Sequence, residues 1–354
     1  MTAPARHRVL LLTPGFPTDE QDSLCIPPLQ LMLRELMARH PDHDVTVLAL
    51  HYPSQTRRYL WHNIEVLALG GANRRWPLRL IDLIRARRLA GRLHAEHTFS
   101  HVHALWLSDA ALVASSIARS WACPWSVTAM GQDVLPGNRY LQKLVRDSAQ
   151  LITISDRASE ALEQSSGRRA DRIIPWGIEP PTGTLSEWDD RPIDVLGVGS
   201  LIDLKRWSLL LDVCGRLTAK DATHRTVLVG DGPLRAQLEA EARERGLADS
   251  LVFTGELPRS EVLRLMEKAR VLLHPSQFEG QGFVFSEALS RGMSIVSGPV
   301  GTATPSERWR IAEPDAMASD CSEFLRLPPP TSALIPYALA DTVSAYANLW
   351  ALDQ

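Results

Sequence analysis

The chain has 354 residues, of which 45% are hydrophobic and 22% charged, a composition typical of a globular protein of about two domains. Its formal net charge of −3 at neutral pH argues against a protein that binds nucleic acid. Cys25, Cys123, Cys214 and Cys321 lack the paired spacing of a zinc site or a disulfide framework. We therefore expect four buried thiols in a reducing compartment.

The first apolar run, Val9–Leu12, ends at Thr13-Pro14-Gly15 and is too short for the core of a signal peptide. We interpret it as a first β-strand. No stretch of about 18 apolar residues occurs, because His101, His103 and Asp109 interrupt the best candidate. The sequence therefore predicts a cytoplasmic protein without a transmembrane segment.

Short apolar runs alternate with segments of helical periodicity along the first half of the chain. The predicted strands are Val9–Leu12, Val45–Leu50, Ile64–Leu69, Val102–Trp106, Ser126–Ala129 and Leu151–Ile154. A segment rich in Pro, Gly, Asp and Thr, Trp176–Pro192, follows and is interpreted as an interdomain linker. Strand, helix and strand at this spacing predict a parallel sheet covered on both faces by helices.

The same alternation restarts after the linker. Strands are predicted at Ile193–Val198, Thr226–Val229, Leu251–Phe253, Val271–Leu273 and Ser294–Val296, and helices at about Trp207–Leu217, Leu234–Arg245, from Ser260 and at Phe283–Arg291. We predict an α/β protein with two doubly wound parallel-sheet domains, 1–180 and 181–335, facing across a ligand-binding cleft. A last helix within 336–354 is expected to pack back on the first domain. Neither half shows a complete G-x-G-x-x-G after its first strand, which argues against a dinucleotide-dependent dehydrogenase.

The most informative stretch is HPSQFEGQGFVFSEAL, residues 274–289. It leaves a predicted buried strand, crosses a loop containing Gly280 and Gly282 and opens a helix, where backbone N–H groups can hold an anion such as a phosphate. Glu287 would lie in the first helical turns, where a carboxylate can accept hydrogen bonds from a ribose, and Glu279 in the loop can face the cleft. The alternative is an ordinary β–α turn with two solvated glutamates.

A lysine follows the first strand of the second half, in the sequence Gly199-Ser-Leu-Ile-Asp-Leu-Lys205-Arg206. Because the chain has 4 lysines and 34 arginines, this position is unusual, and a compact ammonium there can neutralise a diphosphate. The alternative is a surface charge at the start of a helix.

Two other patterns are interpreted as turns. Gly230-Asp-Gly-Pro233 predicts a tight connection from a strand to a helix. Asp42-His43-Asp44 resembles a metal-binding D-x-D motif, but it precedes its strand and is interpreted as a solvated turn.

The segment from Arg74 to Arg92 contains one acid, Asp82, and seven arginines: 74, 75, 79, 85, 87, 88 and 92. Arg85, Arg88 and Arg92 share one stripe of a predicted helix, and Leu80, Ile81 and Ile84 are among its apolar positions. Such a helix can bind an anionic membrane surface. The alternative is a solvated face on a helix whose other face lies in the core.

The ordered motifs of the second half resemble a known family. They are Gly199…Lys205, Gly230-Asp-Gly-Pro, Phe253-Thr-Gly255 and Pro275-Ser-x-x-Glu279-Gly-x-Gly-x-x-x-x-Glu287-Ala. This set, which covers most of residues 193–300, resembles the retaining nucleotide-sugar glycosyltransferases of the two-Rossmann-domain (GT-B) type, glycosyltransferase family four, also called group one. The first half is similar more weakly, through His101-Val-His103, Thr128-Ala-Met130-Gly131-Gln-Asp133, Ile152-Thr-Ile-Ser155 and Ile174-Pro-Trp-Gly177-Ile-Glu179.

The resemblance implies roles for individual residues. Glu287 would hold the donor ribose, Lys205 the diphosphate and Glu279 the transferred sugar, which makes Glu279 and Lys205 the implied catalytic residues. The other implied donor contacts are Gly199, Ser200, Arg206, Leu257 beside the base, Gly280, Gln281, Gly282 and Phe283. Sugar or acceptor contacts are implied at Gly15, His103, Met130, Gly131 and Asp133.

Three positions depart from the family pattern. Ser200 stands where an arginine is usual, so that Lys205 with Arg206 must carry the charge facing the diphosphate. Met130 replaces the histidine of a His-Gly-x-Asp pattern. The segment Pro14-Gly15-Phe16-Pro17 replaces a Gly-Gly loop after the first strand.

The resemblance implies a retaining, metal-independent hexosyltransferase that needs no cofactor beyond a nucleotide-diphosphate sugar. Its acceptor would be a glycan, a lipid-linked molecule or a small molecule in glycolipid, polysaccharide or other glycoconjugate biosynthesis, in the cytoplasm or at the inner face of the membrane. The alternatives are a nucleotide-sugar epimerase of the same architecture and a non-catalytic subunit that binds a nucleotide sugar.

Overall fold

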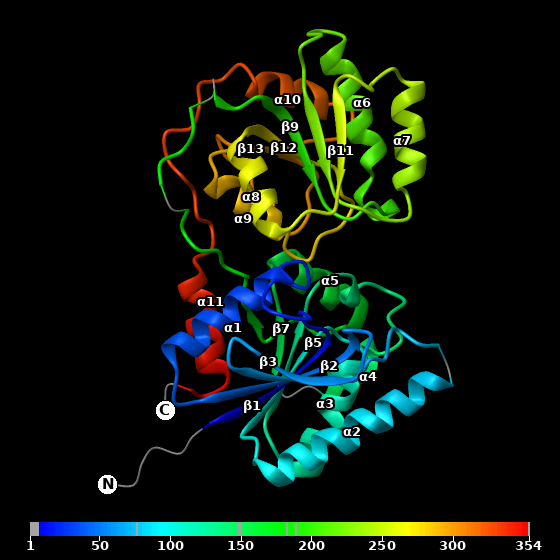
Figure 1. The fold of residues 1–354 in the computed structure, drawn as a ribbon, viewed down its shortest axis with the longest axis vertical. Coiled ribbons are helices and arrows are strands. Elements are labelled where there is room, and N and C mark those ends of the chain that lie inside the picture. The colour runs from blue at the N-terminus through cyan, green and yellow to red at the C-terminus, as the bar shows by residue number, and fades with distance from the viewer. Residues whose placement is uncertain (1–6, 76, 148–149, 182, 188–189, 353–354) are drawn as a thin grey trace. The chain divides into compact units, whose positions relative to one another are not determined.

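The structure is a computed structural model that describes residues 7–75, 77–147, 150–181, 183–187 and 190–352. The described residues form two compact units (Figure 1). The first falls within Met1–Gly177 together with Leu339–Gln354, and the second is Ile178–Ala338.

The first unit contains a sheet with the strand order β3-β4-β2-β1-β5-β6-β7-β8. Its strands are β1 (Arg8–Gly15), β2 (Asp44–Tyr52), β3 (Arg57–Trp61), β4 (Ile64–Ala68), β5 (His101–Leu105), β6 (Trp125–Ala129), β7 (Gln150–Thr153) and β8 (Arg172–Ile173). All pairs are parallel except β3 with β4. The strand β3 was not predicted, because it is an edge strand with exposed arginines. A two-residue turn with positive φ at His62 and Asn63 (45° and 63°) joins it to β4.

The helices of the first unit are α1 (Pro27–Arg39), α2 (Leu78–Glu96), α3 (Asp109–Trp121), α4 (Leu141–Asp147), α5 (Asp156–Ser166) and α11 (Leu339–Leu349), with a single 3₁₀ turn η1 (Gln132–Val134). Two of them start at serine caps. The hydroxyl of Ser108 accepts a hydrogen bond from the N–H of Ala110 (3.3 Å), and that of Ser155 from the N–H of Ala158 (3.1 Å). These caps end the loops that leave β5 and β7.

The C-terminal helix α11 packs beside α1 (Figure 1) and completes the core of the first unit. The Tyr346 hydroxyl lies 2.9 Å from the hydroxyl of Thr128 on β6, and its ring stacks on Trp176 with centroids 5.5 Å apart. Trp176 therefore belongs to the first unit, although the sequence placed it in the linker. Residues 182 and 188–189 of that predicted linker lie outside the described residues.

The expectation of four buried cysteines is wrong, and α2 exposes several apolar residues. Leu80, Ile81 and Ile84 are 43%, 50% and 43% exposed, because α2 turns its small residues Ala86 and Ala90 toward the rest of the unit. The four cysteines are free thiols, but those at positions 25 and 123 are only partly buried. No helix in the described part of the chain is both long and apolar enough to cross a bilayer.

The second unit contains a parallel sheet with the order β11-β10-β9-β12-β13-β14. Its elements are β9 (Ile193–Val198), η3 (Asp203–Lys205), α6 (Trp207–Thr218), β10 (Thr226–Val229), α7 (Arg235–Glu244), β11 (Leu251–Gly255), α8 (Arg259–Glu267), β12 (Ala269–His274), α9 (Phe283–Ser290), β13 (Ser294–Ser297), β14 (Trp309–Ile311) and α10 (Met317–Phe324). Apolar clusters line the sheet: one contains Trp207 and Phe324, and another contains Phe285 and Trp309. The short elements β14 and α10 were not predicted.

Each sheet has a topological switch point, where successive connections leave in opposite directions. In the second unit the chain runs from β9 to β10 and β11 on one side, and from β12 to β13 and β14 on the other. In the first unit the corresponding neighbours are β1 and β5. Open parallel sheets bind ligands outside the carboxyl ends of the strands at this point. The loops after β9 and β12, and those after β1 and β5, are therefore the first places to look for a site.

Candidate functional site

The loops after β9 and β12 are joined by a backbone hydrogen bond. The N–H of Gln277 donates to the carbonyl of Leu204 (2.9 Å), one residue before Lys205. Within the second loop, the Ser276 hydroxyl donates to the carbonyl of Phe278 (2.9 Å). The backbone around Lys205 is therefore fixed relative to the loop that carries Glu279.

Lys205, Glu279 and His274 form one cluster at this switch point. The Lys205 ammonium donates to Glu279 Oε1, and the two side chains are only 16% and 14% exposed. His274 Nε2 lies 2.7 Å from the same oxygen. The imidazole is buried edge-on between the rings of Trp207 and Phe285, with centroids 5.9 and 5.1 Å away. The family resemblance implied Lys205 and Glu279 as site residues, and their contact and the presence of His274 are additions from the structure.

The protonation states of this cluster follow from its geometry. Burial raises the pKa of Glu279, but the hydrogen bonds from His274 and Lys205 and the charge of Lys205 outweigh it and lower the pKa to about 2. Burial also lowers the pKa of His274, against the pull of Glu279. At neutral pH, Glu279 is therefore a carboxylate, which accepts one hydrogen bond from the ammonium of Lys205 and another from the neutral imidazole.

Glu287 has a different partner. It lies in α9, is 8% exposed, and accepts a hydrogen bond from Arg259 Nε at 2.7 Å. Burial raises the pKa of Glu287, and the charge of Arg259 opposes that rise. The sequence analysis missed Arg259, because a contact between α8 and α9 leaves no local signal in either segment.

The start of α9 is shaped by close backbone packing. Gly282 has φ +78°, and a Cβ there would lie 2.2 Å from the ring of Phe285, so that only glycine fits. The carbonyl of Gln281 accepts hydrogen bonds from the N–H and the hydroxyl of Thr302 (2.9 and 3.0 Å). The backbone that precedes the first N–H groups of α9 is thereby held in place.

The other predicted donor contacts are distributed over these loops. Ser200 is exposed, and its carbonyl accepts a hydrogen bond from the Trp207 indole (2.9 Å). Leu257 packs partly against the apolar cluster that contains Phe285. The remaining positions are Gly199 and Arg206 after β9, and Gly280 and Phe283 around the start of α9.

The Gly230-Asp-Gly-Pro turn supports the lysine loop from behind. A Cβ on Gly230 (φ +140°) would lie 2.0 Å from the carbonyl oxygen of Gly199, and one on Gly232 (φ +157°) 2.6 Å from that of Leu201. The N–H of Leu201 donates to the carbonyl of Asp231 (2.9 Å). These contacts agree with the predicted structural role of the turn.

We expect Gly230→Ala to destabilise the protein by about 3 kcal/mol or more, because strained φ and a clash with backbone add together. Gly246→Ala is the matched control: its φ is +70°, but a Cβ there meets nothing within 4 Å, so that about 1 kcal/mol is expected. Urea unfolding measures both free energies. Equal losses would show that the close approach to Gly199 is unimportant.

His103, predicted as a sugar or acceptor contact, is a core residue. It is 0% exposed, with Nδ1 2.7 Å from the Ser126 hydroxyl and Nε2 3.3 Å from that of Thr128. Burial lowers its pKa far below the ordinary value, which keeps the ring neutral. We therefore correct its role: it joins β5 to β6 inside the sheet and offers no nitrogen to a ligand.

Asp133 organises the loops after β5 and β6. Its carboxylate accepts hydrogen bonds from the N–H groups of Leu107 (2.8 Å), Met130 (3.1 Å) and Gly131 (2.7 Å). Burial raises the pKa of Asp133, and these three bonds oppose that rise. Asp133 and the backbone of its two predicted neighbours therefore act as loop supports.

The switch point of the first unit also displays a residue that the sequence analysis placed in a strand. Trp106 follows β5, is partly exposed and has φ +65°, a rare conformation for a bulky side chain. Gly15 ends the neighbouring strand β1 and packs against Cys25 and Tyr52. The signal for Trp106 was an aromatic residue two positions before the helix-capping Ser108, at the carboxyl end of a buried run.

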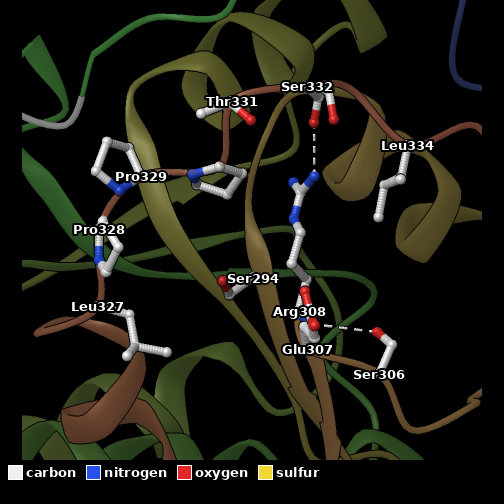
Figure 2. Close-up of a pocket in the computed structure, with 11 residues that line it drawn as sticks. Ser294, Ser306, Glu307, Arg308, Leu327, Pro328, Pro329, Thr331, Ser332 and Leu334 are labelled. Carbon is white, nitrogen blue, oxygen red and sulfur yellow. Dashed lines mark hydrogen bonds between the residues drawn. The ribbon is translucent and has the colours of Figure 1, made fainter.

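A separate hollow of about 610 Å³ lies on the second unit between the starts of β13 and β14 and the Pro-rich segment 327–334 (Figure 2). Arg308 extends across it and donates to the carbonyls of Ser332 (2.7 Å) and Met293 (2.9 Å). Burial lowers the pKa of Arg308 to about 10. Because backbone carbonyls engage this arginine and no predicted donor contact lines the hollow, the loops after β9 and β12 are the stronger candidate.

The side chains of His43 and Asp44 in the Asp42-His43-Asp44 segment form hydrogen bonds with residues at the start of β1. Asp44 accepts a hydrogen bond from Arg8 Nε (3.2 Å), and His43 Nδ1 accepts one from the N–H of His7 (3.2 Å). Among the residues that the structure describes, no group of three or more His, Cys, Asp or Glu side chains is placed to hold a metal ion.

Comparison with known proteins gives matches over the same region. The family model "Glycosyl transferases group 1" matches residues 186–305, which include the Lys205 cluster and Glu287. A 2-deoxystreptamine glucosyltransferase of Streptomyces kanamyceticus is 28% identical over 268 residues, which are 67% of each chain. The phosphatidylinositol N-acetylglucosaminyltransferase gpi3 subunit of Schizosaccharomyces pombe is matched over only 31% of its own length, and an alpha-D-kanosaminyltransferase of Streptomyces kanamyceticus over 43%.

Solved structures share the whole architecture. Sucrose-phosphate synthase from Thermosynechococcus elongatus matches with a TM-score of 0.74 at 19% identity, over 98% of this chain and 97% of that one. Anabaena Alr3699/HepE, in complex with UDP and glucose, matches with a TM-score of 0.71 at 16% identity, over 97% and 99%. The fold is therefore GT-B, which confirms the predicted pair of Rossmann-like units. The family match spans the candidate site, so residues 186–305 are similar to the group 1 glycosyltransferases.

Proposed function

We propose that this glycosyltransferase is a retaining enzyme of family four that moves a hexose from a nucleotide-diphosphate sugar to an acceptor hydroxyl without a metal ion, in the cytoplasm. The observation that carries the proposal is the contact of Lys205, Glu279 and His274 at the switch point of the second sheet. The presence of UDP with glucose in the HepE structure supports a nucleotide-sugar donor.

The reaction breaks the bond between the anomeric carbon and the diphosphate oxygen, and forms a bond from that carbon to the acceptor oxygen on the same face. The acceptor proton passes to the leaving diphosphate. Negative charge grows on the diphosphate while the sugar becomes oxocarbenium-like, so that catalysis requires positive charge at the leaving group. Lys205 supplies an ammonium there, and the first N–H groups of α9 supply dipoles.

The ion pair between Lys205 and Glu279 explains how the buried charges of the site are compensated both without and with the donor. Without donor, each charge compensates the other. When the diphosphate binds, Lys205 pairs with it in place of Glu279. His274 still donates a hydrogen bond to Glu279, so that the carboxylate keeps a partner while it binds sugar hydroxyls. Glu279 positions the sugar and supports its developing positive charge; it is not a nucleophile in this scheme.

Glu287 is proposed to accept hydrogen bonds from the ribose hydroxyls. Its burial would otherwise favour the protonated form, and the Arg259 guanidinium opposes that effect. On the first unit, we place the acceptor at the loops after β1 and β5, where Gly15 and the partly exposed Trp106 lie. An aromatic ring there can pack against the apolar face of a sugar.

A thermal-shift screen tests the proposal, with UDP, GDP, ADP, TDP and their sugars as ligands. One base series should raise the melting temperature, since a ligand at about 100 times its Kd adds roughly 2.7 kcal/mol of stability. Acceptor-dependent release of the nucleotide should follow. Nucleotide release without acceptor as the main activity would instead indicate an epimerase, binding without turnover would indicate a non-catalytic subunit, and no shift with any nucleotide would contradict the proposal.

A further inference from the structure

The outer face of α2 combines apolar and basic side chains. Ile81, Ile84 and Arg88 follow the i, i+3, i+7 spacing of one helical stripe and are all exposed. Leu78 and Leu80 extend the apolar part of this face at 50% and 43% exposure. Figure 1 shows α2 along the outside of the first unit next to α3. Four large aliphatic residues are thus presented to water on the first two turns of one helix.

The arginines around this helix fall into two groups. Arg74 and Arg85 lie 3.6 and 3.4 Å from the buried carboxylate of Asp82, and Arg79 lies 2.6 Å from the buried Asp109. These ion pairs hold the inner side of α2 to the unit. The other group is Arg75, Arg87, Arg88 and Arg92, which are exposed and have no ion-pair partner among the residues that the structure describes.

A hollow of about 270 Å³ continues the apolar face between α2 and α3. Leu80 and Ile84 line it from α2, and Leu112 from α3. Arg87 and Lys143 supply cationic groups to its lining. The hollow therefore has apolar walls beside positive charge. An anionic phospholipid is complementary to it, because its acyl chains are apolar and its phosphate is negative.

We propose that α2 docks on a membrane surface containing anionic phospholipids, with Ile81 and Ile84 in the interfacial layer and Arg87 and Arg88 on lipid phosphates. Aliphatic side chains exposed beside uncompensated arginines match both the apolar and the anionic part of such a surface. The four arginines of the second group give the exposed side of residues 74–92 one sign of charge, because Asp82, the one acid of this segment, is buried. Docking through α2 does not depend on the proposed reaction at the second unit.

Vesicle flotation of the full chain tests this, with phosphatidylcholine vesicles and with vesicles that also contain phosphatidylglycerol. We expect binding to the anionic vesicles alone, and weaker binding as salt is raised. Arg87→Glu with Arg88→Glu should weaken the vesicle affinity by about thirtyfold or more. Ile81→Ser with Ile84→Ser should weaken it by about tenfold or more. All four side chains are exposed, so that the melting temperature should stay unchanged.

Matched controls distinguish docking from general adsorption. Arg225→Glu with Arg243→Glu makes the same change of charge at exposed positions of the second unit, and Leu60→Ser with Val252→Ser removes two aliphatic residues that are 67% and 54% exposed. Neither control should reduce flotation. Equal effects of control and α2 variants, equal binding to neutral vesicles, or no binding at all would overturn the proposal. The proposal would also be overturned if the wild type formed a dimer that the α2 variants dissociate and if neither the dimer nor the monomer floated with vesicles.

Discussion

Replacing Lys205 with alanine is expected to reduce kcat by about 10²–10³, because removing one positive donor from a developing anion has an effect of this size. Lys205 is the cation that contacts Glu279 at the end of β9, and the usual arginine at position 200 is a serine here. The loss should appear in kcat with the preferred donor and acceptor at saturation. Circular dichroism should show an unchanged fold, because Lys205 ends the short 3₁₀ turn η3 outside the sheet and the α-helices.

Lys220→Ala is the matched control, since Lys220 is an exposed lysine of the same unit. It should leave kcat within about twofold of the wild-type value, as surface charges do. Lys205→Arg keeps the charge but changes its shape and should recover only part of the rate. Wild-type turnover in Lys205→Ala would remove this lysine from the mechanism.

Glu279→Gln is expected to lower kcat by about 10²-fold, with a smaller effect on nucleotide binding. The substitution keeps the shape and a hydrogen-bonding oxygen, but removes the negative charge that supports the sugar. It also leaves the Lys205 ammonium without its counter-ion in a site that is only slightly exposed. Glu244→Gln, at an exposed position of α7, is the control and should behave as the wild type.

The pH dependence provides a second measurement of Glu279. Because its pKa in the folded chain is about 2, well below the ordinary 4.5, its ionised form stabilises the fold above pH 4.5. That contribution is lost as the pH falls from 4.5 toward 2. In Glu279→Gln the stability should therefore fall less over this acidic range than in the wild type. The same slope in both proteins would show that Glu279 is not held as a carboxylate.

Contacts between the two loops explain why these effects should be large. The carbonyl of Leu204 accepts from the N–H of Gln277, and Gly230 packs against the backbone of Gly199. The ammonium and the carboxylate are therefore placed by backbone, not by flexible side chains alone. A preorganised charge stabilises a transition state without first having to reorganise.

Much of the second unit could be predicted from the sequence because its signals are local. The strands Ile193–Val198 and Thr226–Val229 have the predicted bounds, since buried parallel strands are continuous apolar runs between turn residues. The strand β14, three residues long, carries too little periodicity to be recognised. The five-residue strand β3 was missed for another reason, because it is an edge strand with exposed arginines.

Side-chain partners were harder to predict than elements. His103 lies within a short strand and was predicted to contact a ligand, but the strands on both sides and the helix α11 bury it. For α2 the sequence left open which apolar positions face the core, and the structure turns Ala86 inward and leaves Ile81 and Ile84 exposed. In both cases, which side of an element is covered depends on neighbours that are distant in the sequence.

The amino-acid sequence by itself determined the alternation of strands and helices, the position of the glycine loops, and the presence of a lysine and two glutamates after predicted strands. Tertiary structure alone decided which of these meet. β9 and β12 are neighbours in the sheet, so Lys205 contacts Glu279 although 74 positions separate them in the sequence. Glu287 instead accepts a hydrogen bond from Arg259. The physical reason is that backbone preference acts over a few residues, while contact between side chains depends on the strand order chosen when the whole sheet is buried.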